Sequence, residues 1–414
     1  MIPARSSLLL LLALPVALAA QPCAQPDLKA PTQQVKAVQS QLLAFKLESD
    51  MDEDVPSELQ DQIGALKDAF AALANAAVEC SPASVDPKSL ETTLAKLLDA
   101  NQPEVQEVYD PKKPPRLDLI YGADLRVKVT RPQSEPQLLL VEFNFGICCG
   151  FDSVLLAYEQ SGGAWDQVLR WQSPAYDNIG DAFGDFFDYE VLPKAGSKNW
   201  LIAVAHGHPW CTSNMSAFDV DLLQPPANQA PQQTLSHRKL DYRRDTDPVM
   251  KAEPGGFELR MTGDSIDINT IMRPVIYRFH LEGSQLVRVQ PIANNGRDFV
   301  DEWLESQWDD ASRWSAAAGL AELKQVHEKI AALHDAIPPA DSPLFTFGPV
   351  RGCSDAKAHY QVELDEDWVD DKGNSRPGSP TFFQIEEGQN SFTMLSAAAN
   401  ADPHCAGPDI MAKH

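Results

Sequence analysis

The stretch LLLVEFNFG, residues 138–146, marks the point where the sequence changes from a helical to a strand-like period. Apolar side chains at alternate positions from Leu139 to Phe145 are separated by the polar Glu142 and Asn144. Side chains two residues apart lie on the same face of a strand. The stretch therefore predicts a β-strand with one face in a core, and it divides the chain into a helical part and a β part.

The strand-like pattern continues downstream of this stretch as far as residue 292. It falls into three groups, around 138–173, 186–243 and 248–292, with turns such as Ser161-Gly162-Gly163 inside them. We predict an antiparallel β domain over residues 118–295. Three blade-like groups cannot close a propeller and no blade motif repeats. A sandwich and a partial propeller-like meander are therefore the two alternatives.

The chain upstream of the stretch has a helical pattern. Residues 57–80 carry apolar side chains at steps of three and four, which is the spacing of one helix face. Asp86-Pro87 predicts the capped start of a further helix. We expect a helical domain over residues 21–105, joined to the β domain by a proline- and charge-rich linker at 106–117.

Two further units are expected after the β domain, which makes the predicted fold class α+β. Residues 296–337 predict a two-helix brace, whose tryptophans Trp303 and Trp314 we expect to pack on the β domain rather than bind a sugar or peptide. Residues 338–414 predict a small β unit bracketed by Cys353 and Cys405.

The first 20 residues have the pattern of a secretory signal peptide. Arg5 precedes an apolar run from Leu8 to Ala20 that ends in small residues. Pro22 stands before Cys23, where a lipid anchor would need a small residue. We expect a soluble periplasmic or secreted protein with no integral membrane segment after cleavage.

The composition narrows the range of partners. A formal net charge of -25 repels nucleic acids and anionic membranes, so no nucleic-acid partner is expected. The same charge favours cations and also keeps an exported protein in solution.

The seven cysteines predict disulfides, because an exported protein folds in an oxidising compartment. Cys211 can meet only one of the adjacent strand residues Cys148 and Cys149, which point to opposite faces. We assign Cys148 as the candidate free thiol. The cysteines assigned to disulfides are Cys23 with Cys80, Cys149 with Cys211, and Cys353 with Cys405.

The segment AHGHPWC, residues 205–211, has two interpretations. His206 and His208 share one strand face, a spacing that suits zinc, with Asp219, His237 or His280 as candidates for a third ligand. The same face is otherwise apolar, and Gly207 and Pro209 interrupt the strand. We therefore favour a structural strand end beside a disulfide.

The segment YDNIGDAFGDFFDYE, residues 176–190, contains the residue types of a calcium-binding loop. Carboxylates gather in this glycine-bearing loop, but their spacing departs from that of a calcium-binding loop. We favour the interpretation of this segment as a solvated acidic turn. For the whole chain we expect no cofactor, and bound Ca²⁺ or Zn²⁺ is the alternative. The candidate metal ligands are His206, His208, Asp177, Asp181 and Asp185.

Two local motifs do not complete a catalytic site. Ser265 lies in a Gly-Asp-Ser sequence, but the chain has no Asp-x-x-His near its end to supply an activating acid and base. His327-Glu328 lacks the histidine that zinc hydrolases place four residues after the first.

The sequence favours a non-enzymatic, disulfide-stabilised binding or interaction module that is exported and binds a protein, a glycan or a small ligand. The alternative is a secreted hydrolase with a noncontiguous site near His206, His208 and the Asp177–Asp188 loop.

Overall fold

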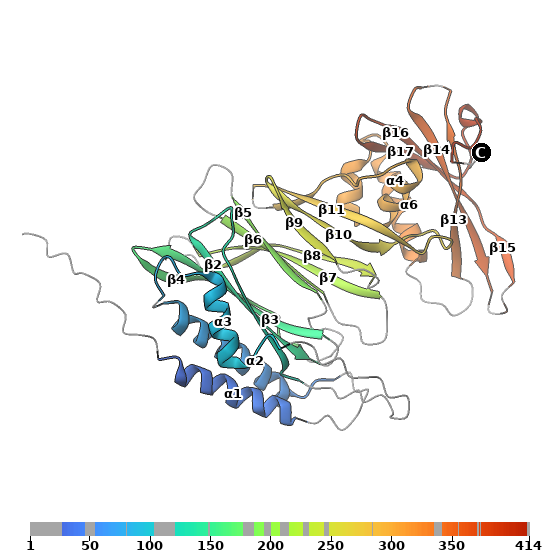
Figure 1. Cartoon of the computed structure of the whole chain (residues 1–414). Coiled ribbons are helices and arrows are strands. Elements are labelled where there is room, and N and C mark those ends of the chain that lie inside the picture. Colours follow the sequence, from blue (N-terminus) through green and yellow to red (C-terminus); the bar gives the residue numbers. More distant parts are fainter. Residues whose placement is uncertain are drawn as a thin grey trace, which may run out of the picture.

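The computed structural model describes residues 27–45, 54–79, 81–102, 121–147, 150–176, 186–193, 200–207, 215–226, 232–243, 248–283, 285–334, 342–354, 356–370, 372 and 374–411. It has a β-rich α+β architecture with antiparallel sheets (Figure 1). The described α-helices are α1 (Lys29–Ala44), α2 (Ser57–Val78), α3 (Pro87–Leu98), α4 (Gly296–Glu305), α5 (Trp308–Ala311) and α6 (Leu320–His334).

The strands form three antiparallel sheets. The first contains β1 (Ala123–Thr130), β2 (Leu138–Ile147), β3 (Gly150–Ser161) and β4 (Ala164–Gln172) in chain order. The second contains β5 (Phe187–Pro193), β6 (Trp200–Gly207), β7 (Met215–Gln224), β8 (Gln233–Arg243), β9 (Val249–Glu253), β10 (Gly256–Asp264), β11 (Met272–Glu282) and β12 (Gln285–Arg288). The third contains β13 (Ser342–Gly352), β14 (His359–Val369), β15 (Ser375–Pro377), β16 (Thr381–Glu387) and β17 (Phe392–Ala398).

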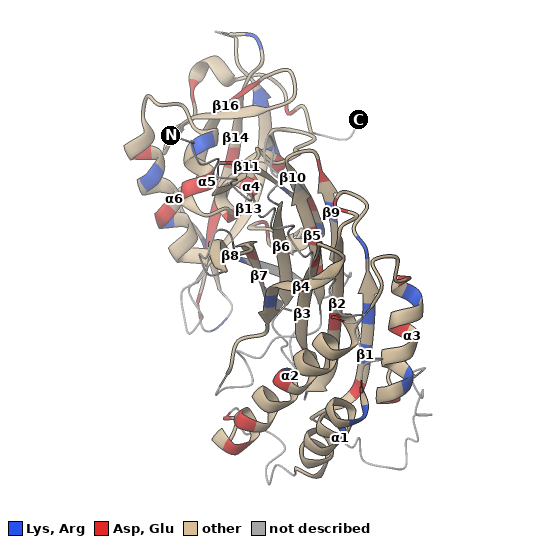
Figure 2. Ribbon diagram, turned by 90° about the vertical axis from the view of Figure 1, so that its left-hand side faces the viewer, with Lys and Arg blue, Asp and Glu red and all other residues tan. Residues whose placement is uncertain are grey.

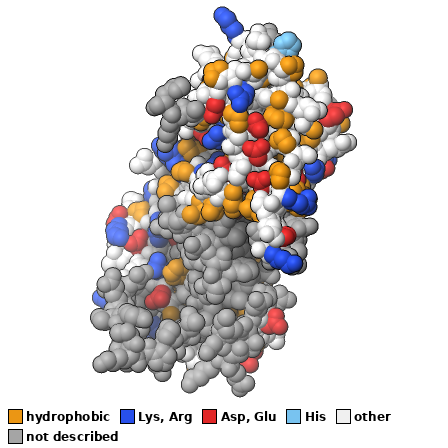
Figure 3. All heavy atoms as spheres, turned by 90° about the vertical axis from the view of Figure 1, so that its right-hand side faces the viewer, with side chains coloured by type: hydrophobic (Ala, Val, Ile, Leu, Met, Phe, Trp, Pro, Cys, Tyr) orange, Lys and Arg blue, Asp and Glu red, His pale blue; other side chains and the backbone are white. Residues whose placement is uncertain are grey.

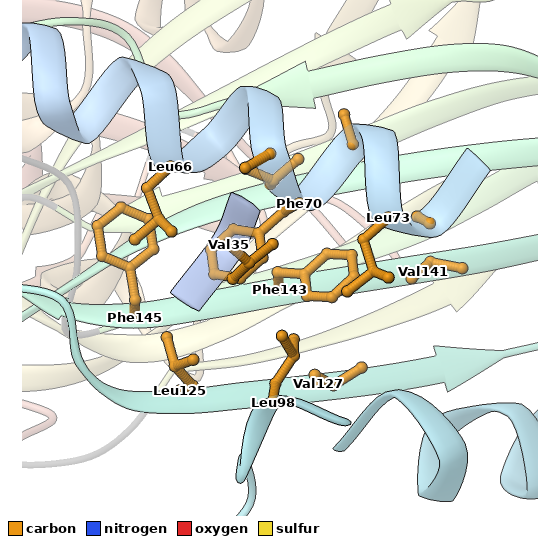
Figure 4. Close-up of a cluster of buried hydrophobic side chains, with 14 of the residues drawn as sticks. Val35, Leu66, Phe70, Leu73, Leu98, Leu125, Val127, Val141, Phe143 and Phe145 are labelled. Carbon is orange, nitrogen blue, oxygen red and sulfur yellow. The ribbon is translucent and has the colours of Figure 1, made fainter. Parts of the chain in front are cut away.

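The N-terminal helices cover one face of the first sheet (Figure 4). The alternation predicted for residues 139–145 is confirmed, because these apolar side chains all join the helices in one core. Phe70 of α2 stacks on Phe143 of β2 with ring centroids 4.8 Å apart. Asp86 caps α3 as predicted and accepts a hydrogen bond from the Ser89 amide at 2.9 Å. The helices and the first sheet therefore share a single core.

The opposite face of the first sheet packs on strands β5–β7. Leu140, Leu155 and Trp171 meet Ile202 and Val204 in this second core. Both faces of the first sheet are thus covered, one by helices and the other by a second layer of strands.

The second sheet consists of two four-stranded meanders, β5–β8 and β9–β12. They are joined through β8 and β10, which pair at Arg243 and Thr262. Their facing side chains, including Leu201, Val220 and Phe257, form a third core. The three strand groups expected from the sequence therefore exist as three successive layers.

The helices α4 and α6 pack their apolar faces against the third sheet, and α4 also forms ion pairs with β11 and β12. Trp303 and Trp314 lie in a core with Phe383 and Met394, whereas the expected packing on the β domain is limited to contacts such as that of Arg288 of β12, 5.2 Å from the Trp314 ring. The strands β14, β16 and β17 contribute Val362, Leu364, Phe383, Ile385, Phe392 and Met394 to this core. On the face of the molecule seen from the side of the third sheet, hydrophobic side chains lie among both basic and acidic ones (Figure 3).

A disulfide joins Cys353 to Cys405, with a sulfur–sulfur distance of 2.00 Å. This is the pair that the sequence assigned to the C-terminal unit. The other predicted disulfide and thiol positions lie outside the described residues: Cys23, Cys80, Cys148, Cys149 and Cys211. The predicted signal peptide and the 106–117 linker lie outside them as well. None of the helices in the described ranges is long and apolar enough to cross a membrane.

The shared core of α2 and the first sheet can be tested with Phe70→Ala. Removing a fully buried phenylalanine should lower the free energy of unfolding by about 3–5 kcal/mol. Leu43→Ala on the exposed side of α1 is the control and should change it by less than about 0.5 kcal/mol. Urea denaturation followed by circular dichroism measures both. Equal small effects would contradict a shared core.

Candidate functional site

A cluster of two histidines and two aspartates lies on one face of strands β6, β7 and β8. Strand register brings His206 opposite Asp219, and Asp221 opposite His237. The carboxylate of Asp221 lies between the imidazoles: its Oδ2 is 3.3 Å from His206 Nε2 and its Oδ1 is 2.8 Å from His237 Nδ1. His237 Nε2 lies 3.8 Å from Asp219 Oδ1.

The environment keeps the Asp221 carboxylate ionised. Burial by itself would raise its pKa, but hydrogen bonds from His206, His237 and the indole of Trp171 hold the pKa below its usual value. The Trp171 ring packs 5.0 Å from the His206 ring, which is almost fully buried. Asp221 thus anchors a buried imidazole, His206, and an exposed one, His237, whose side chain is 57% exposed.

Two of the three candidate partners of His206 are brought to it. Asp219 and His237 lie in the cluster, whereas His280 lies on β11 opposite Gly256. Asp221, which makes the closest contacts, is not among the residues predicted from the sequence. His208 lies outside the described residues. The described parts of the chain contain no group of three His, Cys, Asp or Glu residues arranged to hold a metal ion.

The acidic loop reaches the same neighbourhood through its C-terminal end. Phe187, the first residue of β5, pairs with His206, and the Gly207 amide donates to the Phe186 carbonyl at 2.9 Å. Asp188, the last aspartate of this segment, accepts a hydrogen bond from the Tyr189 amide at 2.9 Å. Asp177, Asp181 and Asp185 themselves lie outside the described residues.

A pocket of about 180 Å³ lies under the loop between β10 and β11. Its walls are mainly apolar, and its polar groups come from the end of β10 and the end of α6. The residues that line it are Asp264, Ser265, Ile266, Ile268, Ile271, His334, Pro343, Leu344 and Phe345. Apolar walls with a few converging polar groups are typical of small-ligand sites.

The loop over this pocket is held by α4. The Asp301 carboxylate accepts the Ser265 hydroxyl at 2.8 Å and the Ile266 amide at 3.0 Å. Arg273 of β11 forms ion pairs with Asp301 and with the next residue, Glu302. Figure 2 shows α4 beside β10 and β11.

One residue at the lip of the pocket has a strained backbone. Ile271 has a φ of 58°, a conformation that costs a β-branched residue free energy, and its side chain is half exposed. Ile268, in the same loop, is also exposed, while its amide donates to the Phe345 carbonyl at 3.0 Å. Strain of this kind is often retained where it serves binding.

The acidic groups behind the pocket are held in different protonation states. Burial, helped by the nearby carboxylates of Asp301 and Asp264, raises the pKa of Glu305 to about 8. By contrast, although burial opposes ionisation, Arg288 and Arg273 hold the pKa of Glu302 at about 2. Glu305 Oε1 lies 3.6 Å from Nδ1 of His334, which lines the pocket. A carboxyl with a raised pKa therefore lies next to His334 at the polar end of the pocket.

This pocket could not be predicted from the sequence, for a physical reason. The sequence predicts an ordinary hydroxyl at Ser265, whereas in the structure this hydroxyl donates a hydrogen bond to the Asp301 carboxylate. Glu305 belongs to the helical run DEWLE, where nothing in the spacing distinguishes a buried carboxylate from an exposed one. His327, the other motif set aside, is buried with its Nε2 near the carbonyls of Trp303 and Ser306.

The comparisons with known proteins identify no family. No protein-family model matches the chain. No curated protein matches its sequence. Among solved structures, it is similar to an α-L-arabinofuranosidase from Fusarium graminearum in complex with an iminosugar inhibitor, at 9% identity and a TM-score of 0.25, covering 66% of this chain. A Penicillium chrysogenum α-L-arabinanase complexed with arabinobiose gives 10% identity and a TM-score of 0.23, covering 71% of this chain.

The chain spans 65% of the arabinofuranosidase chain and 68% of the arabinanase chain. Similarity at this level carries no inference about fold or activity.

The protonated state of Glu305 gives a test of the geometry behind the pocket. A glutamate in the unfolded chain titrates near pH 4.3. Because the pKa of Glu305 is higher in the folded protein, this group contributes its full stabilisation of the fold below that pH. This contribution is lost as pH rises to about 8. Glu305→Gln keeps the shape without the titration, so its stability relative to the natural protein should rise across this window, by at most about 1.4 kcal/mol per pH unit.

Unfolding free energies measured from pH 4 to pH 9 check this expectation. Glu322→Gln, on the exposed side of α6, is the matched control and should show no such trend. A flat difference for Glu305→Gln would mean that Glu305 is ionised in the folded protein.

Proposed function

We propose that the protein is an exported, non-enzymatic binding protein that holds a small apolar amine in the pocket under the β10–β11 loop. The observation that carries the proposal is the composition of the pocket: isoleucine, leucine and phenylalanine walls with the carboxylate of Asp264 at the polar end. An apolar body would occupy the walls and an ammonium group would meet the carboxylate.

The charges of the chain support a cationic ligand over an anionic one. The formal net charge of -25 raises the local concentration of cations. Glu305 is protonated near neutral pH, and a bound ammonium group would stabilise its ionised form. Binding of an amine should therefore release a proton from the protein.

Calorimetry with phenethylamine tests the proposal on the mature protein. We expect saturable binding, and a binding enthalpy that changes with the ionisation enthalpy of the buffer because a proton is released. Phenethyl alcohol, which has the same apolar body without a charge, should bind at least about tenfold more weakly, since a charge-assisted hydrogen bond contributes roughly 1.5–3 kcal/mol.

Variants locate the binding. Asp264→Asn should remove the preference for the amine while leaving the pocket open, and Ile268→Lys should weaken both probes by placing a bulky positive charge in the apolar lining. Glu282→Gln, on the exposed end of β11, should bind like the natural protein. Amine binding that survives Asp264→Asn, or the absence of saturable binding, would refute this function.

The second candidate is the secreted hydrolase, and one observation favours it. An exposed imidazole, His237, is held at 2.8 Å by an ionised carboxylate, Asp221, which is the arrangement of a general base. A reaction centred there would use His237 to take a proton from water or from a nucleophile, and Asp221 to orient the ring.

A panel of chromogenic esters, phosphoesters and glycosides tests this candidate. If it is correct, His237→Ala should lower kcat/KM at least about 100-fold, since general-base catalysis contributes roughly that much. Lys239→Ala, on the same face of β8, is the control and should retain activity. Activity that is independent of His237 would exclude this site.

A further inference from the structure

The interface between α2 and the first sheet contains a buried lysine. Lys67 Nζ donates to the Ser173 carbonyl at 2.9 Å and lies 3.4 Å from Asp152 Oδ2. The Tyr176 hydroxyl donates to the same carboxylate oxygen at 3.1 Å. The Lys67 side chain is 2% exposed and that of Asp152 is not exposed at all. Even-numbered residues of β3 face the helices, and this places Asp152 beside α2.

A cavity of about 50 Å³ reaches this lysine from the surface. Lys67, Ser173 and Tyr176 form its buried end, while half-buried and exposed residues, Gln60, Gly64, Gln172 and Ala175, line the part near solvent. A side-chain carbon added at Gly64 would meet no atom within 4 Å. The volume corresponds to about three to five water molecules, and therefore to a ligand of about that many heavy atoms.

Burial of Lys67 and Asp152 disfavours the charged form of each group. Burial lowers the pKa of Lys67, and the neighbouring Asp152 carboxylate offsets this only in part. Burial likewise raises the pKa of Asp152, against the opposing effects of Lys67, Ser173 and Tyr176. The pair therefore has access to a form in which the amine is neutral and Asp152 holds the proton. A neutral amine is a nucleophile, whereas an ammonium group is not.

We propose that Lys67 is a reactive amine that forms an imine with small aldehydes entering the cavity beside α2. The Nζ lone pair forms a bond to the carbonyl carbon, and the carbonyl oxygen takes the proton held by Asp152. The nitrogen then returns a proton to Asp152, the hydroxyl group leaves as water with that proton, and the C=N bond forms. The neutral amine, the protonated Asp152 and the aldehyde thus give a protonated imine, the Asp152 carboxylate and water, so no oxidant or reductant is required.

Reductive trapping of the mature protein tests this proposal. Acetaldehyde with cyanoborohydride at pH 7, followed by peptide mapping, should modify Lys67 at least about tenfold faster than Lys88, whose side chain is 77% exposed. An exposed lysine with a pKa near 10.4 is unprotonated in only about 0.04% of molecules at this pH. Pivaldehyde, which is too large for the cavity, should react with Lys67 no faster than with Lys88.

Two variants of α2 separate the cavity from the fold. Gly64→Leu should block the cavity and remove the fast modification of Lys67, while Lys88 reacts as before. Ala65→Leu adds the same bulk on the exposed side of α2 and should leave Lys67 reactive. Circular dichroism would verify that both variants fold. Modification of Lys67 no faster than that of Lys88, or fast modification that persists in Gly64→Leu, would overturn the proposal.

Discussion

The strands at the centre of this protein are apolar on both faces, and this constraint sets the arrangement of the layers. Every residue of β6 is buried, and β2 is buried at all positions except Asn144. A sheet with two apolar faces must be covered on each side. The helices α1–α3 cover the outside of the first sheet, and each layer of strands covers the next. At the far end, the core of α4, α6 and the third sheet completes the stack.

Three of the boundaries between layers also contain a small polar group that is matched across the boundary. Lys67 of α2 meets Asp152 of β3, Trp171 of β4 donates to Asp221 of β7, and Arg288 of β12 pairs with Glu302 of α4. Buried charges are costly unless they are paired, so such contacts favour one relative placement of the layers. At the first of these boundaries the pair also places a titratable group with a perturbed pKa, Lys67, in the lining of a cavity, where it can act on a ligand.

Local features of the fold could be predicted from the sequence. The helices, the Asp86 cap, the three groups of strands and the face shared by residues 139–145 all follow from periods of a few residues. The sheet that packs on the Trp303 face of α4 could not be predicted from the sequence. The pattern of an amphipathic helix shows which side is apolar but not which sheet it meets. Asp221 was missed because its contacts with His206 depend on the register between β6 and β7 and on Trp171 from another sheet.

The sequence by itself determined which residues are helical, which are in strands, and which side chains turn inward along each element, since these depend on neighbours within a few positions. Only the tertiary structure decided which inward faces meet, and so which polar groups share a boundary. Asp264 and Glu305, or Lys67 and Asp152, are dozens of residues apart in the chain. These pairs come together because other layers pack on both apolar faces of the sheets. No spacing along the sequence specifies which layers meet.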